Sequence, residues 1–268
     1  MTVLALPPAW RARLAAAADA PPLRPRVPLW CGARRIGTVE PDLFARAGLQ
    51  GGPLVRTAEA GWRLGDGEPT QVLAGIADTL RATGLAHTWR HEQLAVRGED
   101  GVAIATVERG VARALGLATD AVHLTALAPD GSVWVQQRAH DKPTDPGKWD
   151  TLVGGLVPAG ESLDEALARE TWEEAGLRPA QLQALRRGGR VTIRRPLPEQ
   201  AHGYVVEVLH WSTCTLPEGV VPENQDGEVA GFRRMAGAEL QALLEVDEFT
   251  VDAALVLLAA HGDGAVRA

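Results

Sequence analysis

The second half of the chain alternates hydrophobic and polar residues over short stretches, a pattern typical of strands with one buried face. The predicted strands cover residues 121–128, 132–138, 150–157, 190–195, 203–214 and 228–235. Between the third and fourth the period changes to that of a helix, and two more helices are predicted at residues 238–244 and 251–261. Strands on both sides of an isolated helix, with helices at the end, predict a mixed α/β sheet covered on both faces.

The first half of the chain has shorter and more mixed elements. We predict a helix at residues 8–18, strands at 27–30 and 35–39, and a helix at 70–83. The segments "GLQGGPL" and "GDGEPT" are typical of loops. The change of pattern near residue 117 predicts two domains, a smaller α+β domain over residues 1–117 and a larger one over residues 118–268.

Composition narrows the classes of function. Of the 268 residues 46% are hydrophobic, and the formal charge is -7, so we expect a globular protein without nucleic-acid or membrane partners. Cys31 and Cys214 form no disulfide framework or zinc pattern. The N-terminus lacks the features of a signal peptide, and no apolar run approaches the roughly 18 residues of a membrane span. We therefore expect a cytoplasmic protein whose partners are small molecules or cations.

The helix predicted after residue 162 carries an unusual number of acidic residues. Ser162 and Glu165 form a capping box that starts this helix, and Gly176 supplies the left-handed residue that ends it. At about 100° per residue, the three glutamates of "RETWEEAG" leave on one face. Their mutual repulsion suggests a divalent cation among them, since carboxylate oxygens are the ligands of Mg²⁺ and Mn²⁺. The alternative is a solvated acidic face.

The residues around this helix follow a fixed spacing that favours the cation. Gly155 is followed after five residues by Glu161, after seven more by Arg169 and Glu170, and the motif closes at Gly176. The pattern G-x5-E-x7-R-E-U-x-E-E-x-G-U resembles the box of the Nudix hydrolase superfamily. Thr171 departs from it, because that family prefers a bulky aliphatic residue there, which affects packing rather than chemistry. The resemblance implies an α/β/α sandwich with a mixed sheet.

The resemblance also implies an activity, the hydrolysis of a nucleoside diphosphate linked to another moiety, or of a similar diphosphate, by attack of water at phosphorus. The implied cofactor is Mg²⁺, with Mn²⁺ as an alternative. By motif position, the metal ligands are the carboxylates of Glu170, Glu173 and Glu174 and the backbone carbonyl of Gly154. One of these carboxylates would also activate the water. Arg169 lies within reach of Glu173, which it would orient, and Glu161 would assist the metal or the water.

Residues outside the box are candidates for substrate binding. Cations in the segment before the box are candidates to hold the phosphates, with ordinary solvated surface charges as the alternative, and they are Arg138, Lys142 and Lys148. Trp149, and Trp134 before it, are candidates for stacking on a heteroaromatic ring, although a tryptophan more often packs in a core. In "PENQDGEVAGF", Asp226 and Glu228 stand at a strand start where Nudix enzymes often supply a further acid.

A narrower resemblance covers most of the chain and suggests the substrate. The preceding region of about 115 residues, the junction "ATVERGVARALGLATDAVHL" and the late "NQDGE" look like the Nudix domains associated with thiamine pyrophosphokinase. They imply cleavage of thiamine diphosphate or damaged analogues to the monophosphate. The oligomeric state stays open, with a homodimer as one option. Alternatives are ADP-ribose, NADH or dNTP hydrolysis and a diphosphate sensor without catalysis. The loop "DKPTDPGKWD" is also similar to isopentenyl-diphosphate isomerases, which need a catalytic cysteine that is absent from this loop.

Overall fold

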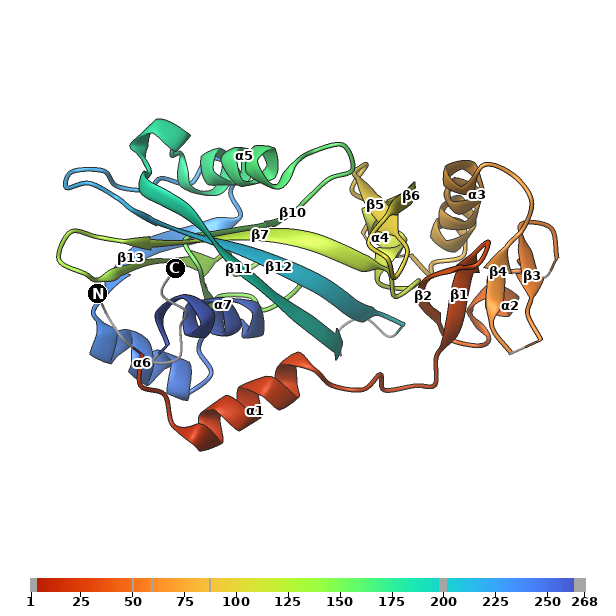
Figure 1. Ribbon diagram of the computed structural model, residues 1–268, viewed down its shortest axis with the longest axis horizontal. Helices are drawn as coiled ribbons and strands as arrows, with labels where there is room; N and C mark the ends of the chain where they lie inside the picture. The colour runs from red at the N-terminus through yellow and green to blue at the C-terminus, as the bar shows by residue number, and fades with distance from the viewer. Residues whose placement is uncertain (1–3, 50, 59, 87, 198–201, 263–268) are drawn as a thin grey trace.

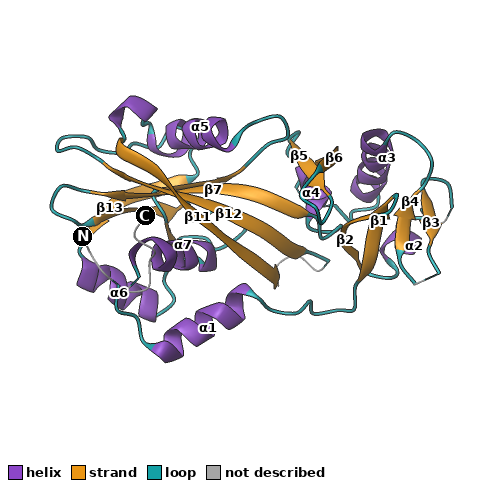
Figure 2. Ribbon diagram, viewed as in Figure 1, coloured by secondary structure: helices purple, strands orange, loops and turns teal. Residues whose placement is uncertain are grey.

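The computed structural model of the protein describes residues 4–49, 51–58, 60–86, 88–197 and 202–262. Its largest element is a mixed sheet in the second half of the chain (Figures 1 and 2). The strands of this sheet are β7 (Ala118–Leu127), β8 (Val133–Arg138), β9 (Trp149–Asp150), β10 (Val153–Leu156), β11 (Gln183–Pro196), β12 (Tyr204–Thr215) and β13 (Val229–Met235). Their order is β11-β12-β7-β8-β13, while β10 pairs with β7 and β9 with β8. The β7–β12 pair is parallel and the other pairs are antiparallel.

Helices cover both faces of this sheet, as Figure 1 shows. Helix α5 (Leu163–Ala175) lies on one face, followed by a 3₁₀ turn at Pro179–Gln181, and α6 (Gly237–Glu245) and α7 (Val251–His261) lie on the other. Strand β7 serves both faces because its side chains alternate. Val122 and Leu124 join the core that includes Leu167 of α5, whereas Thr125 is hydrogen-bonded to His261 of α7 (3.2 Å). The predicted α/β/α sandwich with a mixed sheet is confirmed.

The first half of the chain forms a smaller α+β arrangement beside one end of this sheet (Figure 1). A four-stranded sheet has the order β2-β1-β4-β3, and strands β5 and β6 form a separate hairpin. The elements are α1 (Pro8–Ala18), β1 (Val27–Cys31), β2 (Arg34–Val39), α2 (Leu43–Arg46), β3 (Leu54–Arg56), β4 (Trp62–Leu64), α3 (Pro69–Ala82), β5 (Gln93–Arg97), β6 (Ala103–Glu108) and α4 (Arg109–Ala112). Of the helices in the described ranges, none has the length and hydrophobicity that crossing a bilayer requires.

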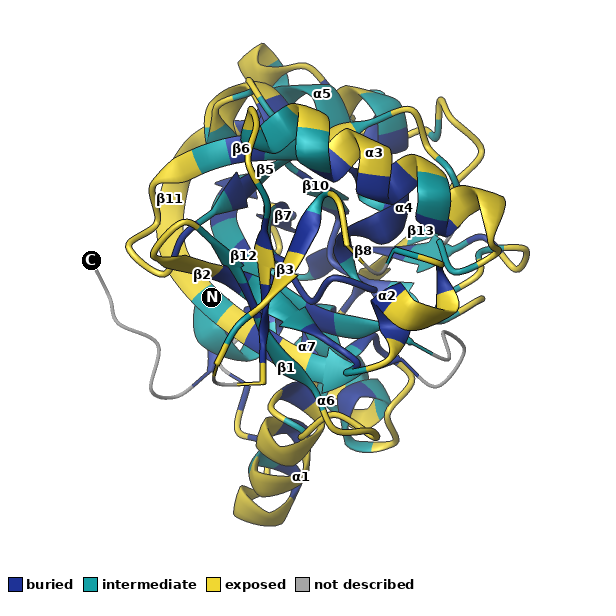
Figure 3. Ribbon diagram, turned by 90° about the vertical axis from the view of Figure 1, so that its right-hand side faces the viewer, coloured by how far each residue is buried: buried dark blue, intermediate teal, exposed yellow. Residues whose placement is uncertain are grey.

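Helix α1 lies apart from the rest of the first half. Its buried residues recur every four positions, at Trp10, Leu14 and Ala18, and the rest of its surface is largely exposed (Figure 3). Trp10 Nε1 donates to the carbonyl of Leu244 in α6 (2.7 Å), and α1 also contacts α7 and β11. The first predicted helix therefore packs against the larger α/β arrangement, although it precedes the proposed boundary near residue 117.

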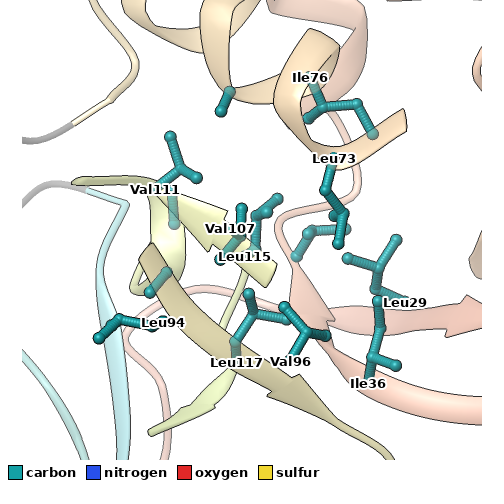
Figure 4. Packing of buried hydrophobic residues seen from close by; sticks show 14 of the residues in the cluster. Leu29, Ile36, Leu73, Ile76, Leu94, Val96, Val107, Val111, Leu115 and Leu117 are labelled. Atoms are coloured by element: carbon teal, nitrogen blue, oxygen red, sulfur yellow. The ribbon is translucent and has the colours of Figure 1, made fainter. Parts of the chain in front are cut away.

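One hydrophobic core joins the two halves of the chain. It contains Leu29, Leu73 and Leu115 from the first half, part of which Figure 4 shows, together with Ile193 and Leu209 from strands β11 and β12. Residue 117 itself lies in this cluster. The division of the chain into two domains at this residue therefore stays a prediction from the sequence, and it does not coincide with a division between two hydrophobic cores.

Candidate active site

Helix α5 begins and ends where its local sequence predicts. The Ser162 hydroxyl accepts from the backbone N–H of Glu165 (3.3 Å), and the Glu165 carboxylate accepts from the backbone N–H of Ser162 (2.8 Å), which completes a capping box. Gly176 ends the helix at a φ of 63°, in the left-handed region that glycine favours. The helix is thereby fixed with its acidic residues beside strand β10.

The contact between Glu170 and β10 requires a glycine. A Cβ atom at Gly155 would lie 2.0 Å from the carboxyl carbon of Glu170, closer than any packing allows. Gly154 has the same property on the other face of the strand, where a Cβ would lie 2.8 Å from the ring of His123. These two glycines let an acid and an imidazole approach the strand from opposite sides.

Arg169 connects the acidic residues of the box. Its guanidinium donates to both carboxylate oxygens of Glu161 (3.1 Å each), to Glu170 Oε1 (2.9 Å) and to Glu173 Oε2 (3.0 Å). It also donates to the backbone carbonyl of Leu156 on β10 (3.3 Å). One cation therefore holds three carboxylates in fixed orientations against the strand.

Glu174 has a different environment from the other two glutamates. It is 4% exposed, and its Oε2 accepts from the backbone N–H of Gly154 (2.8 Å) and from Nε2 of Gln136 (3.0 Å). Burial raises the pKa of Glu174 to about 8, against which the Gly154 hydrogen bond acts, and burial also raises the pKa of Glu170. Ionised carboxylates at both positions need more positive charge than Arg169 supplies.

Part of the box borders a cavity of about 310 Å³ between the two halves of the chain. Nine of the predicted site residues line it, namely Arg138, Lys142, Gly154, Gly155, Arg169, Glu170, Glu173, Asp226 and Glu228. Two of the predicted cations are already engaged, since Arg138 lies 3.4 Å from Asp150 Oδ2 and Lys142 forms an ion pair with Glu228. The cavity wall thus carries acids and cations together.

Five of the predicted residues lie outside the lining of this cavity, and they are Lys148, Trp149, Glu161, Glu174 and Gly176. Lys148 is 3.6 Å from Asp145 Oδ1, an ion pair on its own loop. Trp149 packs against the core under α6 and α7, where it pairs with Phe249. Trp134 is buried below Arg234, whose guanidinium lies 5.9 Å from its ring. Both tryptophan side chains pack against hydrophobic clusters, as a tryptophan more often does, and stacking on a substrate ring stays a prediction.

The carboxylates of the box fit a divalent cation in donor type. Two of them, Glu170 and Glu174, are largely buried, and after burial itself the charge of Glu170 further raises the pKa of Glu174. Among the described residues, however, no three acidic, histidine or cysteine side chains are already grouped as a metal site. The carboxylate oxygens that a cation would bind accept hydrogen bonds from Arg169 and from the Gly154 N–H.

Several polar residues of the cavity were not among the predicted site residues. Five come from the first half of the chain, and they are Thr88, Arg90, Glu92, Arg109 and Arg113. Others come from the far side of the sheet, and they include Thr119, Glu207 and Asp252. Arg109, Arg113 and Thr119 belong to the junction "ATVERGVARALGLATDAVHL", but that segment did not indicate that their side chains would line a site. Their place in the cavity depends on contacts between segments that are far apart in the sequence.

Comparisons with known proteins agree with this geometry. The family described as NUDIX domain matches residues 117–255, just over half of the chain. Nudix hydrolase 24, chloroplastic, of Arabidopsis thaliana is 30% identical over 195 residues, covering 71% of the chain, which spans 53% of that relative's length. An isopentenyl-diphosphate Delta-isomerase of Streptomyces coelicolor is 31% identical over 164 residues, covering 61% of the chain and 80% of the isomerase.

Among solved structures, the crystal structure of DR0079 from Deinococcus radiodurans is 20% identical with a TM-score of 0.48, covering 59% of the chain and 92% of that structure. The box from Gly155 to Gly176 lies wholly within the residues that the family matches. The chain therefore belongs to the NUDIX domain family.

Proposed function

We propose that the protein is a divalent-metal-dependent hydrolase of diphosphates, and that its substrate is thiamine diphosphate or a damaged analogue, cleaved to the monophosphate. One observation carries the reaction class. Glu170 and Glu173 line the same cavity as Arg138 and Lys142, so carboxylates for a cation and cations for phosphates face one space. The proposal extends to this chain the hydrolysis for which its plant relative is named.

In this proposal the box residues have distinct roles. A bound Mg²⁺ or Mn²⁺ would neutralise charge on the phosphate oxygens and lower the pKa of the attacking water. Glu170, Glu174 and the Gly154 carbonyl would hold it. Glu173, with 42% of its side chain exposed, is the carboxylate best able to take a proton from water, and Arg169 orients it.

The phosphates would be held by groups that are at present paired with acids. Arg138 is paired with Asp150 and Lys142 with Glu228, so binding replaces a carboxylate with a phosphate oxygen at each cation. The thiamine-type substrate rests on the narrower sequence resemblance. It is compatible with a cavity of about 310 Å³, the lower end of the range for ligand pockets.

A nucleoside diphosphate linked to another moiety is the main alternative, and a sensor that binds without turnover is another. Isomerase chemistry is favoured by the similarity of the loop "DKPTDPGKWD" and by the similarity to the Streptomyces enzyme. It needs a reactive cysteine, and neither Cys31 nor Cys214 lines the cavity. Burial raises the pKa of Cys214 to about 12, which keeps that thiol protonated.

A substrate panel tests the proposal directly. Thiamine diphosphate, its oxidised analogues, ADP-ribose, NADH and dNTPs are incubated with the protein and Mg²⁺, and the products are identified by mass. We expect monophosphates from the thiamine compounds at the highest kcat/KM. Preference for a nucleotide would remove the thiamine assignment but keep the reaction class, whereas binding without any product would favour the sensor.

Matched variants link the activity to the box. We expect Glu170→Gln to lose at least about 100-fold in kcat, as removal of a group that stabilises the transition state does. Lys148→Gln is the control, because Lys148 lies outside the cavity lining. Full activity in Glu170→Gln would refute the metal assignment.

A further inference from the structure

The cavity has a second polar end, away from the box carboxylates. Besides Arg195, three charged side chains line it there, and each comes from a different part of the chain. Arg113 follows α4 in the first half, Glu207 lies on β12, and Asp252 lies in the first turn of α7. Along β7, Thr119 pairs with Glu207 of β12, and His123, four positions later, pairs with Gly154 of β10. Four positions correspond to about 13 Å along a strand.

Arg113 lines this end without a bonded partner. Its guanidinium makes no hydrogen bond or ion pair with any residue of the described ranges, although the side chain is largely buried. Burial lowers its pKa, and Glu207 is the acid that most opposes this shift. A buried guanidinium offers five N–H donors, so leaving it unpaired is costly unless a ligand accepts from it.

Glu207 faces the same space with unused acceptor capacity. The side chain is 8% exposed, and its Oε2 accepts one side-chain hydrogen bond, from Thr119 Oγ1 (3.1 Å). An ionised carboxylate can accept about four hydrogen bonds. This acid therefore has acceptor sites for a donor in the cavity.

Asp252, on α7, likewise has acceptor capacity that is not used. Its Oδ1 is buried and accepts no hydrogen bond within the described part of the chain. The nearest cation is Arg195, whose guanidinium is 3.7 Å from this oxygen and whose Nε is itself buried without a partner. Two acceptors and two donors thus border this end with hydrogen bonds unmade.

We propose that Arg113, Glu207 and Asp252 form a subsite that binds the non-phosphate half of the substrate, and that this half is an amino-substituted nitrogen heterocycle. The proposal rests on the proposed diphosphate hydrolase, whose box would hold the phosphates at the other end. It also gives the first half of the chain a role, because Arg113 comes from that half.

The chemistry of the subsite selects this class of ligand. The carboxylates accept and the guanidinium donates, so a group that satisfies them must do both. An amino group beside a ring nitrogen does so along one edge of an aromatic ring. The faces of such a ring would meet apolar side chains that line the same cavity, among them Leu117, Ile193 and Val205. An aminopyrimidine and an aminopurine both present this edge.

Binding measurements on the full-length protein test the subsite without requiring turnover. The affinities of thiamine diphosphate, ADP-ribose and inorganic pyrophosphate are measured by calorimetry with Ca²⁺, for the wild type and for Glu207→Gln, Asp252→Asn and Arg113→Gln. Each variant should lose about 10- to 100-fold in affinity for the heterocyclic diphosphate that the wild type binds more tightly. Affinity for pyrophosphate, which has no ring, should stay within about twofold.

Comparison of the three ligands distinguishes the possible results. A loss with thiamine diphosphate identifies an aminopyrimidine and a loss with ADP-ribose an aminopurine, and either supports the subsite. Equal losses with pyrophosphate, or no loss in any variant, would overturn it. The control is Glu218→Gln, since Glu218 is exposed. Thermal melts show whether each variant is folded. Because three variants are used, the test still works if one of them does not fold. Ring-dependent binding without cleavage by the wild type would reject the hydrolase and keep the subsite.

Discussion

At the scale of single residues, Gly155 decides where Glu170 lies. A Cβ would meet the Glu170 carboxyl group at 2.0 Å, so Gly155→Ala must displace that side chain from Arg169 and from the cavity wall. We expect this variant to lose at least about 100-fold in kcat/KM, similar to Glu170→Gln, since an acid displaced by about 1 Å or more no longer meets its partners. Steady-state kinetics on the best substrate of the panel measure the loss.

The control for Gly155→Ala is another glycine in the same sheet. A Cβ at Gly231, on β13, meets no atom within 4 Å, so Gly231→Ala should keep activity within about twofold of the wild type. Thermal melts would show whether both variants are folded. If Gly155→Ala is folded and fully active, the close approach of Glu170 has no catalytic consequence.

The spacing of the box singled out Glu170 and Glu173, both of which line the cavity, but it did not predict how each carboxylate is used. Helical geometry alone puts Glu170, Glu173 and Glu174 on one face. The structure turns Glu174 toward Gln136, which lies 38 positions earlier on β8. That contact depends on the pairing of distant strands, and no local pattern at Gln136 indicates it.

At the scale of elements, α7 carries an ionisable group near each end, and Asp252 is partly buried whereas His261 is buried. Burial raises the pKa of Asp252 from 3.8 to about 7 and lowers the pKa of His261 from 6.5 to about 4. As pH rises from 3.8 to 7, the unfolded chain ionises Asp252 before the folded one does, so stability falls. As pH falls from 6.5 to 4, the unfolded chain protonates His261 first, and stability falls again.

Opposite pH profiles are therefore expected for variants at the two ends of α7. Relative to the wild type, Asp252→Asn should gain about 1–3 kcal/mol in the free energy of unfolding between pH 4 and pH 7.5. For His261→Asn, the free energy of unfolding relative to that of the wild type should rise by a similar amount as the pH falls from about 7 to about 4.5. Urea unfolding at a series of pH values measures both, and parallel profiles for all three proteins would contradict the assignment.

The sequence predicted the boundaries of elements where a local capping pattern marks them, but not where the alternation of hydrophobic and polar residues is lost. The predicted helix at residues 251–261 matches α7, and the Ser162 capping box begins α5. Strand β11, in contrast, begins at Gln183 rather than at residue 190. Its first half is exposed and carries two register shifts, so no hydrophobic period marks it.

At the scale of the whole molecule, the two halves share a core that the sequence does not indicate. Each half shows its own periodicity, but periodicity does not reveal which faces meet. Arg26 of the first half adds a polar contact across this junction, donating to the carbonyl of His202 in the second half (3.1 Å). Because the cavity lies between the halves, their association also determines the shape of the site.

A shared core predicts that the protein unfolds in a single cooperative step. Leu115 is 0% exposed and lies in the core that both halves build. Leu115→Ala should lower the free energy of unfolding by about 2–5 kcal/mol, whereas Leu185→Ala, at a residue 42% exposed, should change it by less than about 1 kcal/mol. Urea unfolding followed by tryptophan fluorescence and far-UV circular dichroism should give coincident transitions in each protein. Two separated transitions, with only the earlier one moved by Leu115→Ala, would mean that the halves fold independently and that the cavity can open without loss of the sheet.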